Sequence, residues 1–229
     1  LNQKRGIPKW IISKQILTGN LFAGFPADWK ENPYLKTPEK LTNDFVWATF
    51  LSPHGNAAEM RALDRNDDFS KILATGSDKD LGGFLIKAEP DCNEKIVANL
   101  EAAIDSMSYH AFYPGRIAMS SMGVNFNLAV KTAIEALDGG YKYSLAFDND
   151  LAGNQATVSF KKQFINDVDE TTYNQLIDEG KIKLFDLGIK VLKETIKNGG
   201  IYYFDNVEGE IGMEAVKMFQ EQLRKDIGN

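Results

Sequence analysis

Apolar positions in the second half of the chain alternate between short continuous runs and runs with helical spacing. Continuous runs indicate strands, and helical spacing follows each of them, in the order 96–100 and 102–112, 116–119 and 125–137, 143–147 and 153–165. Two more strands are expected at 183–187 and 201–204, with a helix near 188–197 between them and a last helix at 211–224. Repeated alternation of strand and helix predicts a mostly parallel, Rossmann-like sheet that is covered by helices.

The first half of the chain has a less regular pattern. A helix is predicted over 7–17, and a loop that contains three prolines follows over 20–43. The apolar runs 45–51 and 57–63 flank a short turn, which favours a β-hairpin, and a short strand is expected at 84–86. These elements predict a smaller α+β domain ahead of the parallel sheet.

Composition sets the class of protein. The 229 residues suffice for one or two globular domains, and we expect residues 1–90 and 91–229 to form two, with the boundary at Pro90. The single cysteine, Cys92, excludes an internal disulfide and a cysteine-based zinc site, which favours a reducing, cytoplasmic location. No apolar run approaches the ~18 residues needed to cross a bilayer. The first residues have no apolar segment behind their charges, so we expect no signal peptide; because the chain begins with Leu1, we expect an excised fragment.

Charge is unevenly distributed along the chain, although the net charge is only −6. Residues 1–40 carry seven Lys or Arg against three acidic residues, whereas residues 91–170 carry six against eleven. An acidic protein is not a general coat for nucleic acid, but a local basic groove is compatible with this balance. The asymmetry suits a protein that holds phosphates with one part and cations with another, and it is also common on solvated surfaces.

Three acidic residues follow the ends of predicted parallel strands, where functional groups of such sheets gather. Glu101 follows the strand 96–100, and Asp148 and Asp150 follow the strand 143–147. Side chains two residues apart in an extended segment point to the same side, so both aspartates would face one point. Crowded carboxylates repel each other unless a cation or a proton intervenes, and oxygen ligands suit Mg²⁺ or Mn²⁺. The pattern therefore predicts a divalent metal site that can support phosphoryl transfer.

An Asp-x-Asp pair alone is most often a turn or a solvated face. Here an apolar strand precedes the pair, and Ala152 and Gly153 then open a helix, which favours a site. A receiver domain of two-component signalling also carries acidic residues at strand ends. It would need an acidic pair after its first strand and a lysine on a late strand, and that order is absent from the sequence.

The motifs resemble the TOPRIM domain, which bacterial primases, topoisomerases and some nucleases share. The segments that carry the resemblance are Glu101-Ala-Ala-Ile-Asp105, Ser120-Ser-Met-Gly123 and Phe147-Asp-Asn-Asp-Leu-Ala-Gly153, whose order and spacing are most similar to DnaG-type primases. The resemblance implies that Glu101, Asp148 and Asp150 are catalytic and hold the metal. It also implies supporting roles for three residues, namely Asp105, Gly123 and Gly153. Asp105 lies one helical turn after Glu101, and Gly123 would allow a tight turn near the acidic residues.

A weaker resemblance extends toward the amino terminus. The segments concerned are Lys4-Arg-Gly-Ile7, the pair Gly55 and Arg61, Phe69-Ser-Lys71 and Thr75-Gly-Ser-Asp-Lys79. They are similar to the primase core, and the later ones to the LtrC-like primase-like proteins of conjugative plasmids and transposons. The resemblance implies that Arg61, Lys71 and Lys79 bind the phosphates of a template strand. Arg grips a phosphate in bidentate fashion and Lys acts as a point charge, although solvated surface side chains are the plain alternative.

The sequence also departs from the primase pattern. Primases usually carry an arginine directly after the Ala-Gly, where this chain has Asn154. They also carry later acidic residues, for which Asp186, Asp205 and Asp226 are candidates that the sequence does not separate. The zinc ribbon that commonly precedes primase cores is absent from a chain with one cysteine.

Three functions remain open on these grounds. The favoured one is a metal-dependent, primase-like nucleotidyltransferase of a mobile element, with single-stranded DNA and nucleoside triphosphates as ligands and a helicase or relaxase as partner. The second is a module of a conjugation or replication complex that binds single-stranded DNA without catalysis, which Asn154 favours. The third is a nuclease that uses the same metal site with water as nucleophile. A type I topoisomerase is disfavoured because the chain has no room for its large strand-cleaving domains.

Overall fold

The computed structural model describes residues 1, 6–24, 47–63, 71–78, 80–92, 94–148, 151–184, 190–192 and 203–205. The chain divides into two compact units, Leu1–Phe185 and Asp186–Asn229. The first unit contains both of the sheets that bear on function.

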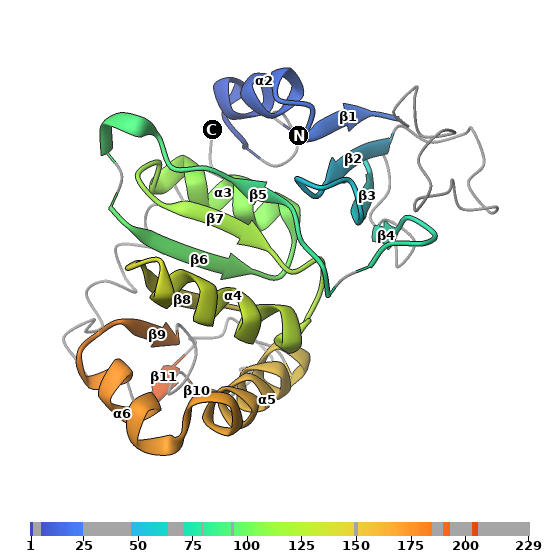
Figure 1. Cartoon of the computed structure of the whole chain (residues 1–229). Helices are drawn as coiled ribbons and strands as arrows, with labels where there is room; N and C mark the ends of the chain where they lie inside the picture. Colours follow the sequence, from blue (N-terminus) through green and yellow to red (C-terminus); the bar gives the residue numbers. More distant parts are fainter. Residues whose placement is uncertain are drawn as a thin grey trace. The chain divides into compact units, whose positions relative to one another are not determined.

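An antiparallel sheet forms the amino-terminal part of the first unit. Helix α2 (Lys9–Leu17) precedes four strands in the order β1 (Leu21–Ala23), β2 (Trp47–Leu51), β3 (Ala58–Ala62) and β4 (Lys71–Leu73) (Figure 1). The predicted helix and the hairpin β2–β3 are confirmed. The prediction of loop throughout 20–43 is wrong at β1, and β4 was not predicted, because strands of three residues are too short to carry a period.

The central sheet has five strands in the order β5-β7-β6-β8-β9. The strands are β5 (Leu85–Ile86), β6 (Ile96–Leu100), β7 (Ile117–Ser120), β8 (Lys142–Ala146) and β9 (Ile182–Leu184). Strands β6 to β9 pair in parallel, and β5 pairs antiparallel with β7. The predicted mixed α/β fold with a mostly parallel sheet is confirmed, and the strands predicted near 96, 116 and 143 are present.

Helices cover both faces of the central sheet. The four helices are α3 (Ala103–Phe112), α4 (Phe126–Asp138), α5 (Leu151–Val168) and α6 (Glu170–Asp178). Residues of α3 share one core with β5, β6 and β7, whereas α4 and α5 share a second core with β6 and β8 on the other face. The three predicted helices of this region are confirmed, and α6 was not predicted.

The core under α3 also joins the central sheet to the amino-terminal sheet. Ile11 of α2 and Phe50 of β2 belong to the same buried cluster as Phe84 and Met107, which lie beside β5 and in α3. The rings of Phe50 and Phe84 meet edge to face with their centroids 5.4 Å apart. The two sheets therefore pack on a common core, and the domain boundary at residue 90 stays a prediction.

The second unit is described only as a two-stranded antiparallel sheet of β10 (Lys190–Leu192) and β11 (Tyr203–Asp205). The prediction of a helix over 188–197 is wrong at β10, because strand pairing with a segment further along the chain overrides local helical spacing. The strand predicted at 201–204 overlaps β11. The helix predicted at 211–224 lies outside the described residues.

Candidate metal and nucleic-acid site

The register of the central sheet sets two of the predicted carboxylates at one edge. Strands β6 and β8 are parallel neighbours, and Leu100 pairs with Ala146 at the end of the ladder. Glu101 comes directly after β6, and Asp148 comes two residues after β8, so both leave the same edge of the sheet. Asp148 is exposed and Glu101 is half-buried, with its Oε2 atom buried. The third predicted carboxylate, Asp150, lies outside the described residues.

The loop after β7 holds the backbone of Glu101. The carbonyl oxygen of Glu101 accepts hydrogen bonds from the Gly123 N–H at 2.8 Å and from the Ser120 hydroxyl at 3.2 Å. Gly123 has a φ of 125°, which lies in the region that favours glycine, and Met122 before it has a φ of 54°. This tight turn fixes the carboxyl end of β6, which carries Glu101.

Gly153 holds the turn that carries Asp148. A β-carbon added at Gly153 would lie 1.9 Å from the carbonyl oxygen of Asp148, much closer than any real contact. The first turn of α5 therefore approaches the end of β8 so closely that only glycine fits. A glycine here lets helix α5 start directly behind the acidic residues, as the spacing of the motif requires.

Asp105, in the first turn of α3, is half-buried like Glu101. Burial raises the pKa of the Asp105 carboxyl, and the charges of Asp148 and Glu59 raise it further. Arg61 and Lys71 lower that pKa. These opposing effects show that four sequence-predicted residues, Asp105, Asp148, Arg61 and Lys71, share one electrostatic neighbourhood.

Arg61 and Lys71 reach this neighbourhood from the amino-terminal sheet. They are directly paired in the antiparallel register of β3 and β4, and both side chains are half-buried. The third predicted phosphate-binding residue, Lys79, lies outside the described residues. Two cations of the amino-terminal sheet thus act on the Asp105 carboxyl of α3.

Glu59, which is fully buried in β3, was not predicted as a site residue. Its Oε1 accepts a hydrogen bond from the Arg61 Nε–H at 3.1 Å, and its Oε2 accepts one from the backbone N–H of Ala103 at 3.1 Å. The available signal was a charged residue between the apolar residues Ala58 and Met60 of a predicted strand. Its partner in α3 is 44 positions away and leaves no local trace.

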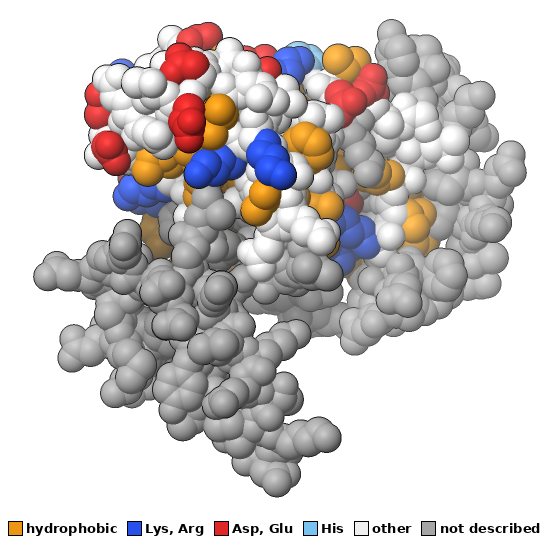
Figure 2. All heavy atoms as spheres, turned by 90° about the horizontal axis from the view of Figure 1, so that it is seen from below, with side chains coloured by type: hydrophobic (Ala, Val, Ile, Leu, Met, Phe, Trp, Pro, Cys, Tyr) orange, Lys and Arg blue, Asp and Glu red, His pale blue; other side chains and the backbone are white. Residues whose placement is uncertain are grey.

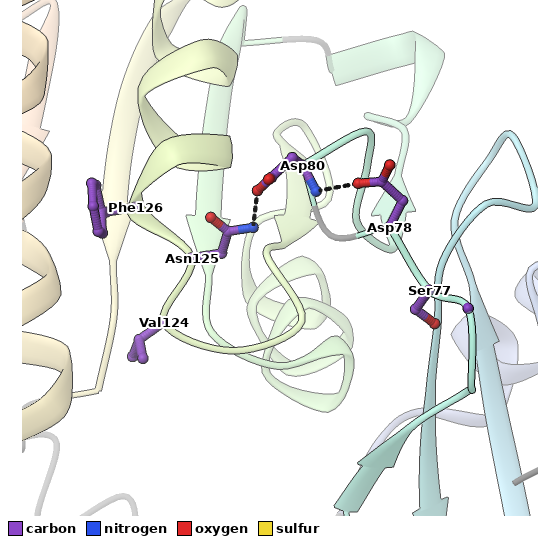
Figure 3. Close-up of a pocket in the computed structure, with 7 residues that line it drawn as sticks. Ser77, Asp78, Asp80, Val124, Asn125 and Phe126 are labelled. Carbon is purple, nitrogen blue, oxygen red and sulfur yellow. Dashed lines mark hydrogen bonds between the residues drawn. The ribbon is translucent and has the colours of Figure 1, made fainter.

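An open cavity of about 730 Å³ lies where the amino-terminal part meets the start of α4 (Figure 3). It is lined by Gly76, Ser77, Asp78, Asp80, Val124, Asn125 and Phe126. The Asn125 amide donates to Asp80 Oδ1 at 3.2 Å, while its oxygen accepts from the Leu128 N–H and caps α4. The cavity therefore lies between residues 76–78 of the predicted phosphate-binding segment and the loop that follows Gly123.

The charges of the surface do not by themselves mark a binding face. In the described part of the face shown in Figure 2, Lys and Arg side chains lie among hydrophobic and acidic ones. Among the residues that the structure describes, no three His, Cys, Asp or Glu side chains form a group placed to hold a metal ion. The donor set still fits a divalent cation, because two carboxylates leave adjacent strands at one edge and Asp150 follows Asp148 by two positions.

Replacing Asp105 with asparagine is expected to stabilise the metal-free protein at neutral pH. The folded state raises the pKa of this carboxyl from its ordinary value of 3.8, so it binds the proton more tightly than the unfolded chain does. The stability that the Asp105 carboxyl contributes is fully present below pH 3.8. It is lost as the pH rises through the raised pKa of the folded state. Urea unfolding between about pH 4 and about pH 7 should show the advantage of Asp105→Asn growing with pH. If the gain in free energy of unfolding from Asp105→Asn shrinks with rising pH, the pKa of Asp105 is not raised in the folded protein.

A comparison with known protein families agrees with a mixed α/β fold that carries acidic residues after neighbouring parallel strands. Residues 99–181, from the end of β6 to the residue just before β9, match the model of the Toprim-like family. A comparison with curated proteins found no match. No helix among the described residues is long and apolar enough to cross a membrane.

Two solved structures are reported as similar in fold. The primase fragment of the bacteriophage T7 primase-helicase is 16% identical, with a TM-score of 0.42, over 79% of this chain and 61% of that one. The zinc-binding and RNA polymerase domains of the Aquifex aeolicus primase are 16% identical, with a TM-score of 0.44, over 77% of this chain and 54% of that one. The chain thus spans little more than half the length of either protein.

Proposed function

We propose that the chain is a metal-dependent domain that acts on nucleic acid by phosphoryl transfer, in the manner of a primase. One observation carries the proposal: Arg61 and Lys71, paired in β3 and β4, act electrostatically on Asp105 of α3, on which the charge of Asp148 at the end of β8 also acts. Carboxylates suit a divalent metal, and Arg and Lys suit phosphates. The two halves of a phosphoryl-transfer site thus come from two different sheets.

Glu101, Asp148 and Asp150 would hold Mg²⁺ or Mn²⁺. When bound, the cation supplies charge that stabilises the phosphate oxygens during transfer. Arg61 and Lys71 bind and orient the phosphates of the strand or of the incoming nucleotide, with Lys79 as a further contact. The turn at Gly123 and the close approach at Gly153 keep Glu101 and Asp148 at fixed positions. Burial and the charge of Asp148 raise the pKa of Asp105, so a further negative charge beside these carboxylates is disfavoured.

The finer assignment follows from the resemblance of the amino-terminal segments. We infer a primase-like protein of a mobile element in the cytoplasm, acting on single-stranded DNA with nucleoside triphosphates beside a helicase or relaxase. The alternative of a DNA-binding module without catalysis is favoured by Asn154, which stands where primases carry arginine. Which of Asp186, Asp205 and Asp226 would join the site is left open by this proposal.

Incubation with single-stranded DNA, labelled nucleoside triphosphates and Mg²⁺ or Mn²⁺ tests the proposed reaction. A primase makes short, labelled RNA that depends on both template and metal. A nuclease shortens the DNA without incorporating label, and a binding module retards the DNA without changing it. Absence of labelled product with either metal, under conditions where the DNA is bound, would replace the catalytic proposal with the binding one.

Single-stranded DNA should bind more weakly to Arg61→Ala and to Lys71→Ala than to the wild type. Each contact with a phosphate releases counterions, so each variant should also lower the slope of log affinity against log salt by about one. Fluorescence anisotropy with a labelled oligonucleotide over a salt series measures both quantities. Lys162→Ala removes an exposed lysine of α5 and serves as the matched control. Equal affinities and slopes for all four proteins would remove β3 and β4 from the DNA-binding surface.

A further inference from the structure

Glu59 is a buried carboxylate with no place in the proposed reaction. Its side chain is fully buried, and its neighbours Ala58 and Met60 in β3 belong to a separate apolar cluster. Burial of a charged group is unfavourable unless the group is paired and hydrogen-bonded. The bonds that Glu59 makes should therefore have a consequence for the molecule.

The two oxygens of Glu59 bind donors from different parts of the chain. Arg61 lies two residues along β3, on the same side of the strand as Glu59, and donates its Nε–H to Oε1. This bond uses the Nε–H, and among the described residues no hydrogen bond of the terminal N–H groups is seen, so these groups can turn toward a phosphate. The Ala103 N–H donates to Oε2 from the first turn of α3 in the Toprim-like domain.

Glu59 acts as the cap of α3 from outside the helix. The residue at the N-cap position is Ala102, whose side chain cannot accept a hydrogen bond, and no side chain of its own segment caps this helix. A carboxylate at this end also interacts favourably with the helix dipole. Glu101 comes two residues before Ala103, and Asp105 lies in the same first turn. The cap therefore holds the backbone that carries the acidic side of the site.

We propose that Glu59 is a positioning residue that fixes Arg61 relative to Glu101 by joining β3 to the start of α3. This inference rests on the proposed function, because it assigns Arg61 to phosphate and Glu101 to metal. One carboxylate would thus set the spacing between the phosphate-binding and metal-binding sides. Because Glu59 contacts neither ligand, it acts through Arg61 and through the helix.

The variant Glu59→Gln separates positioning from simple electrostatics. Glutamine keeps the size of the side chain but replaces one of the two oxygens with an NH₂ group, so one of the two donors then faces another donor. Loss of a negative charge beside Arg61 would by itself strengthen binding of an anion. Positioning predicts the reverse: the affinity for single-stranded DNA should fall at least tenfold. The rise in melting temperature with millimolar Mn²⁺ should also shrink, because Glu101 is held less firmly.

A double-mutant cycle adds a readout that a purely structural role would not change. In the Arg61→Ala background, Glu59→Gln should cause little further loss of DNA affinity, because the group that it positions is gone. Glu94→Gln is the matched control, since Glu94 also pairs with an arginine, Arg116, at 2.7 Å on another part of the chain. That control should leave DNA affinity and the Mn²⁺ response unchanged.

The outcomes separate this inference from the proposed reaction. A wild type that makes no RNA, with both losses seen in Glu59→Gln, would overturn the reaction and leave the positioning role intact. DNA affinity of Glu59→Gln equal to or tighter than that of the wild type, or losses that add to those of Arg61→Ala, would overturn the positioning role. A wild type that binds neither DNA nor Mn²⁺ would overturn both. If Glu59→Gln melts below the assay temperature, Glu59→Asp, which keeps the charge but shortens the reach, should show the same two losses, and unchanged values would overturn the inference.

Discussion

Asp148→Asn is expected to abolish the response of the protein to divalent metal and to lower any phosphoryl-transfer rate by at least about a hundredfold. Asparagine nearly preserves the shape of aspartate but removes the charge that the cation needs. In the wild type, a metal that binds the folded state raises the melting temperature by mass action. A thermal-shift series with Mg²⁺, Mn²⁺ and chelator, together with the primer-synthesis assay, measures both effects.

The metal-free form of Asp148→Asn should be as stable as the wild type or slightly more stable. The charge of Asp148 raises the pKa of Asp105, which shows that the two carboxylates repel each other. Asp138→Asn changes an exposed aspartate at the far end of α4, beside the opposite edge of the sheet, and should leave the metal response unchanged. If Asp148 only caps a turn, Asp148→Asn should be neutral with and without metal, because asparagine caps about as well. No metal-dependent shift in the wild type at millimolar Mn²⁺ would favour the DNA-binding module.

The alternation of apolar runs and helical spacing predicted the central sheet well because both periods are local. Strand β6 was predicted with its observed bounds, and α3 within one residue. The ends of these strands then indicated Glu101 and Asp148, since parallel strands leave the same edge together. Where the predicted elements were wrong, the pairing of strands distant in the sequence decided the structure. Strand β10 pairs with β11 where helical spacing predicted a helix, and β1 adds to β2 from within a predicted loop.

The joint between the two sheets could not be predicted from the sequence. Glu59 would have to be connected with Ala103, which is 44 positions away, and a backbone N–H has no signature in the sequence. The resemblance of motifs indicated Arg61 and Lys71 as phosphate ligands, but their nearness to Asp105 depends on how β3 and β4 pack against α3. Such packing depends on the buried residues that the two sheets share.

Phe84→Ala should lower the free energy of unfolding by about 3–5 kcal/mol, because it removes a fully buried aromatic side chain and leaves a cavity. The ring of Phe84 meets Phe50 of β2 and belongs to a cluster with residues of α2, α3 and the central sheet. A single core implies that both sheets of Leu1–Phe185 lose stability together. Urea unfolding followed by circular dichroism and by tryptophan fluorescence should show coincident transitions, both shifted to lower denaturant.

The matched control for Phe84→Ala is Phe112→Ala, which makes the same substitution in a side chain of α3 that is 74% exposed. It should change the free energy of unfolding by about 0.5 kcal/mol or less. Two separate transitions in Phe84→Ala, with only one of them shifted, would show that the sheets unfold independently. The spacing between Arg61 and the acidic edge would then depend on a mobile interface, and the bond from Glu59 to the start of α3 would be the main restraint on it. Coincident transitions would instead mean that the shared core holds the two sheets together and that Glu59 fixes Arg61 relative to Glu101 within that frame.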